Sequence, residues 1–309
     1  MRILVVGAGA IGGYFGGRLL EAHQDVTFLV RPRRAAELER SGLMIRSRFG
    51  DVTIPQPPRV LAENLREPFD LVLLSNKAFD LESAIASFTP AVGVNTAILP
   101  LLNGMRHLDI LDAHFGASRI LGGQCLIAVT VSEKGEIVHL NETHDISFGE
   151  RDGSMSDRVK SIARLMQTTR FQVRASTEIV HEMWSKWVFI AAAASATCLM
   201  RASVGDIGAA PGGTEFVLGL LEECRSIAAA RGYPPREAAL QRSRDMLTAK
   251  GSGLTASMLR DIERNAPIEA DHIVGDLIER GSGAGLPLLR IAYTHLKAYE
   301  NRRQRSQTS

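Results

Sequence analysis

The stretch that decides the fold is Val5-Val6-Gly7-Ala8-Gly9-Ala10-Ile11-Gly12, near the start of a chain of 309 residues. An apolar run from Ile3 to Val6 is typical of a strand buried on both faces, and the periodic stretch from Ile11 to Leu20 predicts a helix. The glycines form a G-x-G-x-x-G pattern between that strand and that helix, which is where the pattern binds a dinucleotide pyrophosphate. We therefore predict cofactor contacts from Gly7, Gly9, Ala10, Ile11 and Gly12.

Strand and helix patterns alternate through the first half of the chain. Further strand candidates are Val26–Val30, Leu71–Leu74, Ala97–Leu101 and Ile120–Val131. The alternation predicts an α/β domain with a Rossmann-type parallel sheet over residues 1–175. Antiparallel strands at Glu136–Leu140, Asp145–Phe148 and Phe171–Val173 are expected to complete this domain.

Helical patterns dominate the second half, and residues 176–300 are predicted to form an all-α domain. The expected helices are Ile179–Leu199, Thr214–Arg231, Pro235–Thr248, Ile268–Arg280 and Pro287–Tyr299. The apolar run from Trp187 to Met200 has 14 residues, too few for a membrane span, and indicates a buried helix. Residues 301–309 are polar and basic, which favours a disordered tail.

Composition narrows the class of partner. The chain carries 36 Lys+Arg and 34 Asp+Glu, and this near balance argues against nucleic acid, while no segment calls for a membrane. Three widely spaced cysteines, Cys125, Cys198 and Cys224, indicate neither a disulfide framework nor a metal site. A cytoplasmic protein is the default expectation, and the apolar helical half makes a homodimer plausible.

The residue after the second strand indicates which dinucleotide binds. An NAD site usually places a carboxylate there for the ribose 2′-hydroxyl, but here the position is Arg31, followed by Pro32, Arg33 and Arg34. Because a guanidinium binds a 2′-phosphate in a bidentate manner, NADP(H) is the predicted cofactor. The alternative is that these arginines form a solvated helix start, and use of NADH as well stays open.

Three polar side chains stand where the chemistry is expected. Lys77 and Asn103 each follow a predicted parallel strand, at the edge of the sheet where ligands bind. Lys186 lies between Trp184 and Trp187 at the head of the apolar helix, where partial desolvation would suit it to general acid work. A lysine that extends its ammonium group from a helix end into solvent is an equal reading of Lys186.

Two further segments carry a resemblance to a known family. These are Ser257-Met258-Leu259-Arg260-Asp261 and the Ile-Glu-x-Asp-x-Ile-x-Gly run from Ile268 to Gly275. With the glycines, Lys77, Asn103-Gly104 and the Trp-x-Lys at 184–186, they resemble ketopantoate reductase over roughly residues 2 to 298. The resemblance implies a Rossmann domain, a helical domain and NADPH-dependent reduction of a 2-keto acid in pantothenate biosynthesis.

The same resemblance implies roles for individual residues. Lys186 would be the general acid, and Glu269 would orient that lysine or the substrate. Ser257 would contact the substrate carboxylate. Lys77 and Asn103 would line the junction of cofactor and substrate.

Two positions depart from the family pattern. One and two turns after the lysine, where the family carries asparagines, this chain has Ile190 and Ala194. The change favours a more apolar or bulkier substrate than ketopantoate. The alternatives are a β-hydroxyacid-dehydrogenase-type oxidoreductase and a non-catalytic NADP-binding sensor. No metal is predicted: His181-Glu182 begins a zincin pattern, but Ser185 occupies the second histidine position.

Overall fold

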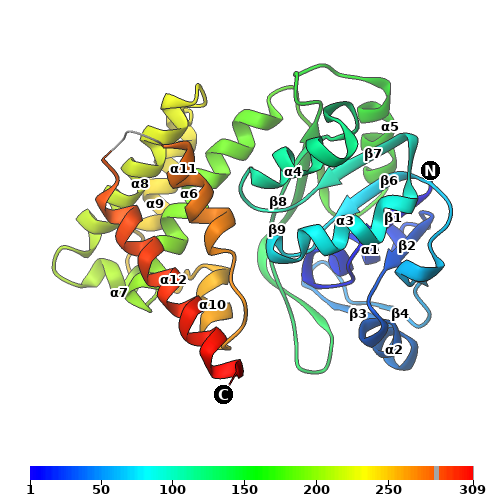
Figure 1. Ribbon diagram of the computed structural model, residues 1–309, viewed down its shortest axis with the longest axis horizontal. Coiled ribbons are helices and arrows are strands. Elements are labelled where there is room, and N and C mark those ends of the chain that lie inside the picture. Colours follow the sequence, from blue (N-terminus) through cyan, green and yellow to red (C-terminus); the bar gives the residue numbers. More distant parts are fainter. Residues whose placement is uncertain (282–284, 309) are drawn as a thin grey trace. The chain divides into compact units, whose positions relative to one another are not determined.

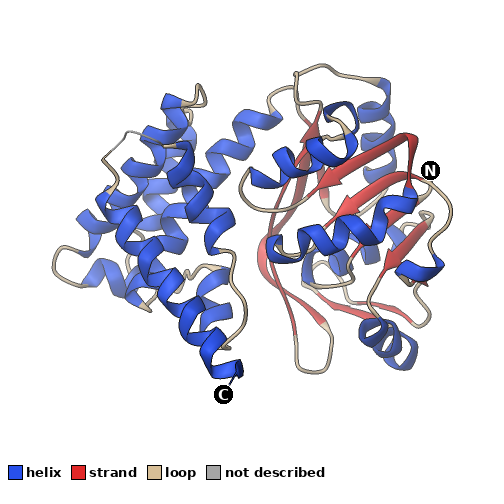
Figure 2. Cartoon of the chain, viewed as in Figure 1, coloured by secondary structure: helices blue, strands red, loops and turns tan. Residues whose placement is uncertain are grey.

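The computed structural model describes residues 1–281 and 285–308, which fold into two compact units (Figures 1 and 2). The first unit comprises Met1–Leu102 and His107–Ile179. The second contains Asn103–Arg106 and the chain from Val180 on, so a short loop leaves the sheet half to join the helical half. A parallel sheet with helices followed by a helical unit confirms the predicted fold class.

The first unit holds all the strands of the described chain. They are β1 (Ile3–Val6), β2 (Val26–Leu29), β3 (Leu43–Arg46), β4 (Val52–Ile54), β5 (Arg59–Val60), β6 (Phe69–Leu74), β7 (Val92–Pro100), β8 (Gly122–Val131), β9 (Ile137–Gly149) and β10 (Gln172–Ala175). The helices are α1 (Ala10–Glu21), α2 (Pro32–Ser41), α3 (Leu81–Phe88), α4 (Arg106–Phe115) and α5 (Asp157–Met166). Short 3-10 turns, η1 (Ala62–Asn64), η2 (Ala78–Asp80), η3 (Thr89–Ala91) and η4 (Ala117–Arg119), join some of them.

A parallel sheet in the order β5-β2-β1-β6-β7 forms the centre of this unit. Its registers place Val6 beside Leu29 of β2 and Leu74 of β6. The strands β1, β2 and β6 therefore end together, and the loops that follow them share one edge of the sheet.

A second sheet, in the order β10-β9-β3-β4 with β8 beside β9, accompanies the first. Helix α1 packs against strands of both sheets. A Cβ on Gly13 would lie 2.3 Å from the Ile137 side chain of β9, and one on Gly16 would lie 2.6 Å from the Phe28 ring of β2. Because any side chain at these positions would collide, the glycines of α1 let one helix fit between two sheets.

The second sheet corrects several predicted strands. In the predicted strand Ile120–Val131, Ile120 forms an isolated parallel bridge to Ile98 of β7. From Gly122 on, this segment is β8, which pairs antiparallel with β9. The two predicted strands at Glu136–Leu140 and Asp145–Phe148 are one long strand, β9. The strand at 171–173 was expected to be antiparallel, but β10 runs parallel to β9. Its chain returns through α5, and a helical crossover brings a strand back parallel.

The second unit consists of helices. They are α6 (Ile179–Met200), α7 (Val204–Ala209), α8 (Gly213–Ala230), α9 (Glu237–Leu247), α10 (Ser257–Glu263), α11 (Asp276–Arg280) and α12 (Pro287–Thr308), with a π-turn, η5 (Asp271–Gly275), before α11. The predicted helix Ile268–Arg280 is thus a π-turn followed by α11. The first unit ends at Ile179, whereas the sequence places the boundary after residue 175.

The chain's last residues differ from the expected tail. Helix α12 continues from Pro287 through Thr308, with Tyr299 buried and its hydroxyl donating to the Ala266 carbonyl at 2.8 Å. Arg303 Nε donates to the Asn265 carbonyl at 2.9 Å. These contacts hold the helix where composition alone indicates disorder. Ser309 lies outside the described residues.

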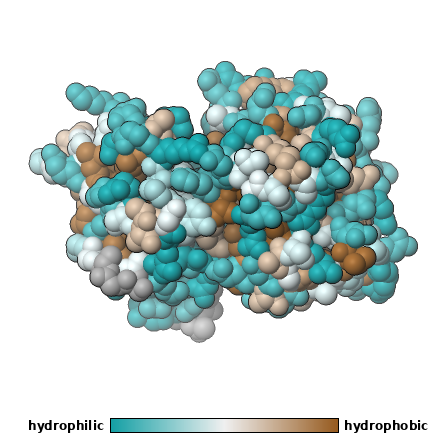
Figure 3. All heavy atoms as spheres, turned by 90° about the horizontal axis from the view of Figure 1, so that it is seen from above, coloured by the Kyte–Doolittle hydropathy of each residue, from teal (hydrophilic) through white to brown (hydrophobic). Residues whose placement is uncertain are grey.

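Helix α6 is the one described helix long and apolar enough to span a membrane by composition, but 67% of its most apolar window is buried within the structure. That burial is typical of a core helix, as predicted for this segment. The surface in Figure 3 is largely polar, with apolar residues showing between polar ones. Exposed examples such as Val94 and Ile291 come from different elements, and the homodimer stays a prediction.

Candidate functional site

The glycine loop after β1 has the geometry that the motif predicts. Gly7 has a φ of +93°, which favours glycine, and a Cβ on Gly12 would lie 2.1 Å from the Gly7 carbonyl oxygen and 2.2 Å from Ser75 Oγ. A Cβ on Gly9, by contrast, would meet nothing within 4 Å among the described residues. The loop is therefore closed on its inner side and open at Gly9.

The start of α1 suits an anion. Gly9 is the N-cap and brings no side-chain cap, and the first turn of this described helix, which includes Ala10 and Ile11, has no acidic residue. The backbone N–H groups of that turn and the positive end of the helix are available for a pyrophosphate. The residues present therefore fit a dinucleotide.

Arg31 stands at the same sheet edge, directly after β2. Its Nη2 donates to Asp80 Oδ1 at 2.7 Å and to Ser83 Oγ at 3.3 Å, while 68% of its side chain stays exposed. Arg33 points into solvent, with 93% of its side chain exposed. The structure thus separates these two arginines: Arg31 has partners at the sheet edge, and Arg33 is almost fully exposed.

Arg34 is different again, since only 18% of its side chain is exposed. Its Nε donates to the Ala8 carbonyl at 3.0 Å, inside the glycine loop, and its Nη1 donates to Glu37 at 3.1 Å. Its Nη2 is buried, and the described residues supply it with no hydrogen-bond acceptor. Arg34 therefore braces the loop, and nothing in the sequence pattern indicates this contact.

Lys77 follows β6 and precedes the turn η2. Asn76 Nδ2 donates to the Lys77 carbonyl at 2.8 Å, and the Lys77 carbonyl also accepts from the Asp80 amide at 2.9 Å. Ser75 Oγ donates to the Val6 carbonyl at 3.0 Å. These bonds tie the loop after β6 to the glycine loop and, through Asp80, to Arg31, so the first unit brings these predicted cofactor residues to one edge.

The remaining predicted site residues all lie in the second unit. Lys186 is half-buried in α6 beside the buried Trp184 and Trp187. Glu269 is buried just before the π-turn. Ser257 is exposed at the first turn of α10, and Asn103 belongs to this unit although it follows β7.

Two residues near these positions were not identified from the sequence as site residues. The His272 imidazole is hydrogen-bonded to the Asn103 backbone, and burial lowers the pKa of His272, with the nearby Glu269 charge opposing the shift. Trp187 Nε1 donates to the Ile273 carbonyl at 2.9 Å. Nothing in the sequence marks either contact, because both depend on the shape of the π-turn.

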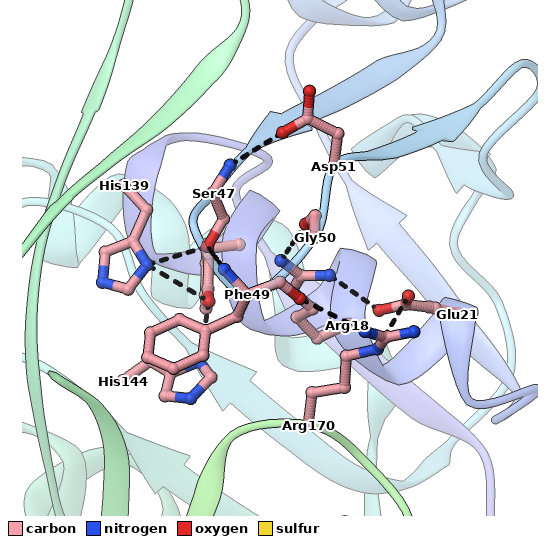
Figure 4. A network of polar contacts seen from close by, with 10 residues as sticks. Arg18, Glu21, Ser47, Phe49, Gly50, Asp51, His139, His144 and Arg170 are labelled. Atoms are coloured by element: carbon pink, nitrogen blue, oxygen red, sulfur yellow. Dashed lines mark hydrogen bonds and ion pairs between the residues drawn. The ribbon is translucent and has the colours of Figure 1, made fainter. Parts of the chain in front are cut away.

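His139 and His144 of β9 take part in a separate network in the first unit (Figure 4). Tyr14 Oη lies 2.8 Å from His144 Nδ1, and Ser47 Oγ lies 3.0 Å from His139 Nδ1. Phe49 stacks on His144 with ring centroids 3.8 Å apart. Burial, and then the neighbouring His139, lower the pKa of His144.

The same network holds a buried cation. Arg18 of α1 is fully buried, and its guanidinium donates to Glu21 at 2.8 Å and to the Gly50 carbonyl at 2.6 Å. Figure 4 shows Arg170 reaching the same Glu21 from another segment. The loop between β3 and β4 is therefore fastened to α1, and His144 packs against the same helix and loop through Tyr14 and Phe49.

Comparison with known proteins covers nearly the whole chain. The family description "Ketopantoate reductase PanE/ApbA" matches residues 3–153, and its C-terminal counterpart matches residues 178–300. The oxidoreductase YkpB of Bacillus subtilis is 36% identical over 97% of this chain and 99% of its own length. A 2-dehydropantoate 2-reductase of Archaeoglobus fulgidus is 26% identical over 92% of each chain.

Solved structures give the same result. A 2-dehydropantoate 2-reductase of Geobacter metallireducens is 28% identical, covers 96% of this chain and 99% of its own, and superposes with a TM-score of 0.88. A D-mandelate dehydrogenase in complex with NADH and anilino(oxo)acetate has the same TM-score of 0.88 over 98% of this chain and 100% of its own. At 19% identity, this second likeness concerns the fold alone.

Proposed function

The chain belongs to the ketopantoate reductase family and is an NADP-dependent oxidoreductase, and we propose that it reduces a 2-keto acid with an apolar side chain to the 2-hydroxy acid. The observation that carries the proposal is the grouping in the second unit. This unit contains all four predicted catalytic and substrate-binding residues, although they come from segments far apart in the sequence: Lys186, Glu269, Ser257 and Asn103. Cytoplasmic location is part of the proposal, and a role in pantothenate biosynthesis would follow only if ketopantoate were the better substrate.

The residues of this chain divide the chemistry among them. NADPH, when bound, supplies the hydride. Lys186 donates a hydrogen bond to the carbonyl oxygen and then its proton, as negative charge develops there. Glu269 is a buried carboxylate that would keep the lysine ammonium charged against desolvation. The Ser257 hydroxyl donates to the substrate carboxylate.

The polarity of the substrate side chain is inferred from the face of α6 that carries Lys186. Ile190 and Ala194 lie one and two turns beyond Lys186, and Ala194 is buried. A helix face with an isoleucine and an alanine offers apolar contact in place of hydrogen bonds to a substrate hydroxyl. We therefore propose branched or aromatic 2-keto acids as better substrates than ketopantoate.

The test is NADPH oxidation with ketopantoate and with a series of branched and aromatic 2-keto acids. We expect the apolar acids to give the higher kcat/KM, and Ile190→Asn to move the preference toward ketopantoate. The Lys186→Ala variant should lose about 100-fold or more in kcat. Lys250→Ala removes an exposed lysine of the same unit and is the matched control.

Three outcomes would contradict the proposal in different ways. Equal kcat in Lys186→Ala and the wild type removes the lysine from the mechanism. Activity only as oxidation of a 3-hydroxy acid supports a β-hydroxyacid-dehydrogenase-type enzyme. Tight NADPH binding without turnover of any carbonyl acid supports a sensor.

A further inference from the structure

The π-turn, Asp271–Gly275, contacts segments that carry the predicted catalytic residues of the second unit. Its backbone hydrogen bonds span more residues than those of an α-helix, since the Asp276 N–H donates to the Asp271 carbonyl five residues back. Glu269 precedes the turn, and the Ile273 N–H donates to the Glu269 carbonyl at 3.0 Å. Such wide turns within helices occur frequently at functional sites.

The first contact comes from α6. Trp187, adjacent to Lys186, donates its indole N–H to the Ile273 carbonyl at 2.9 Å, and the indole is buried. Ile273 therefore joins Trp187 to Glu269, because its carbonyl accepts from the Trp187 indole and its N–H donates to the Glu269 carbonyl. This short chain of hydrogen bonds links the helix that carries the lysine to the segment that carries the carboxylate.

The indole is also held across its face. Arg280 places its guanidinium carbon 5.8 Å from the centroid of the Trp187 ring. The Nε of Arg280 donates to both carboxylate oxygens of the buried Asp276, at 3.1 and 3.0 Å. The indole is thus contacted on its face by Arg280 and at its N–H group by the Ile273 carbonyl.

The second contact comes from the loop after β7. A Cβ on Gly104 would lie 2.8 Å from the His272 carbonyl oxygen, so this loop passes directly over the π-turn. The His272 imidazole is hydrogen-bonded to the Asn103 backbone. His272 of the π-turn therefore holds Asn103. Its neighbour Ile273 holds Trp187, the residue next to Lys186.

We propose that Trp187 is a positioning residue, which sets Lys186 against Glu269 through its indole hydrogen bond to the Ile273 carbonyl. The inference rests on the proposed function, in which those two side chains carry the proton transfer. A shift of the helix by a fraction of an ångström would separate the ammonium from the carboxylate and from the substrate carbonyl. The hydrogen bond therefore acts on kcat, whereas the glycine loop that binds NADPH lies in the other unit.

The kinetic test compares two tryptophans one helical turn apart. Trp187→Phe keeps a ring but loses the N–H donor, and Trp184→Phe changes a neighbour that stacks on Tyr233 with centroids 5.6 Å apart. We expect Trp187→Phe to lower kcat about tenfold or more and to shift the alkaline limb of its pH profile. Trp184 packs on Trp187 with ring centroids 4.9 Å apart, so Trp184→Phe reports the effect of altered ring packing alone. It should change kcat and the pH profile far less than Trp187→Phe does, and the Kd for NADPH should be the same in both variants.

A near-isosteric analogue separates the hydrogen bond from ring packing. The chain has 2 tryptophans, so in the Trp184→Phe protein β-(3-benzothienyl)alanine replaces Trp187 alone. This analogue has sulfur in place of the N–H group. We expect it to reproduce the loss of kcat seen in Trp187→Phe. A kcat equal to that of the Trp184→Phe parent overturns the proposal.

A measurement without turnover distinguishes this proposal from the proposed function. The rate at which acetic anhydride labels Lys186, read by mass spectrometry from pH 6 to 10, reports the environment of that ammonium group. We expect the labelling rate at pH 8 to change about threefold or more in Trp187→Phe and by clearly less in Trp184→Phe. If the wild type reduces no 2-keto acid, the proposed function fails, and an unchanged labelling curve in Trp187→Phe overturns the positioning role independently.

Discussion

Replacing Arg31 by alanine is expected to weaken NADPH binding selectively. In the structure, the Arg31 guanidinium stands at the end of β2 with 68% of its side chain exposed and one ion pair, to Asp80 at 2.7 Å. An ion pair this exposed contributes about 0–1 kcal/mol, so the guanidinium can turn to a phosphate at small cost. The 2′-phosphate of NADPH is the group that NADH lacks, and only NADPH should respond strongly.

The expected size follows from the bonds lost. Hydrogen bonds to charged groups contribute about 1.5–3 kcal/mol net, which corresponds to about 10- to 100-fold in affinity. We expect Arg31→Ala to raise the Kd for NADPH by that factor and the Kd for NADH by less than about threefold. Asp80→Asn should act in the opposite direction, because it removes the negative charge that pairs with Arg31 and that would compete with the phosphate for it.

Calorimetric titration of each variant with NADPH and NADH measures both constants directly. Arg33→Ala is the matched control, since it removes the same charge from a side chain that is 93% exposed, two residues away. Equal losses for the two dinucleotides in Arg31→Ala would refute the assignment. So would a larger loss in Arg33→Ala, which would make the effect one of net charge.

Three further predictions concern stability and the loop. Gly12→Ala should lower stability by about 1–3 kcal/mol, because its Cβ would lie 2.1 Å from the Gly7 oxygen, whereas Gly9→Ala should weaken NADPH binding without changing Tm. Urea denaturation at several pH values should show stability lost as pH falls below the ordinary His144 value of 6.5, since burial lowers the folded-state pKa and the unfolded chain binds the proton first. A flat profile would contradict that, and so would a His144→Phe variant whose stability falls with pH as steeply as that of the wild type, since the lowered pKa values of His272 and His295 account only for the remainder. Ser203→Ala removes the capping box of α7 and should cost about 0.5–2 kcal/mol in urea denaturation.

The central parallel sheet could be predicted because its signals are local. The run Ile3–Val6 is buried completely along its length, and the glycines and Arg31 sit directly after strands, so strand order alone brings them together. The strands β3 and β4 were not predicted, because both are short and the strand that joins their hairpin to the second sheet, β9, lies far along the chain. Their pairing is a tertiary effect that overrides weak local preference.

The candidate site shows the same division. Motif order located Lys186, Glu269 and Ser257, and whether they act as predicted is left to the experiments above. The hydrogen bond that Trp187 donates to the π-turn and the one that His272 makes from this turn to Asn103 could not be predicted, since helical periodicity gives no sign that a backbone hydrogen bond spans five residues in place of four. Nor could the sequence assign Asn103 to the second unit, because its neighbours in the chain belong to the sheet.

The position of α1 between two sheets has a consequence for synthesis on the ribosome. Tyr14, one of the first residues to emerge, finds its hydrogen-bond partner His144 130 positions later. Until β9 and β10 have left the exit tunnel, α1 has a sheet on one side and water on the other. We expect the nascent first unit to stay sensitive to protease until about residue 175 is exposed, and to fold slowly for its size, because its closing contacts are distant in sequence.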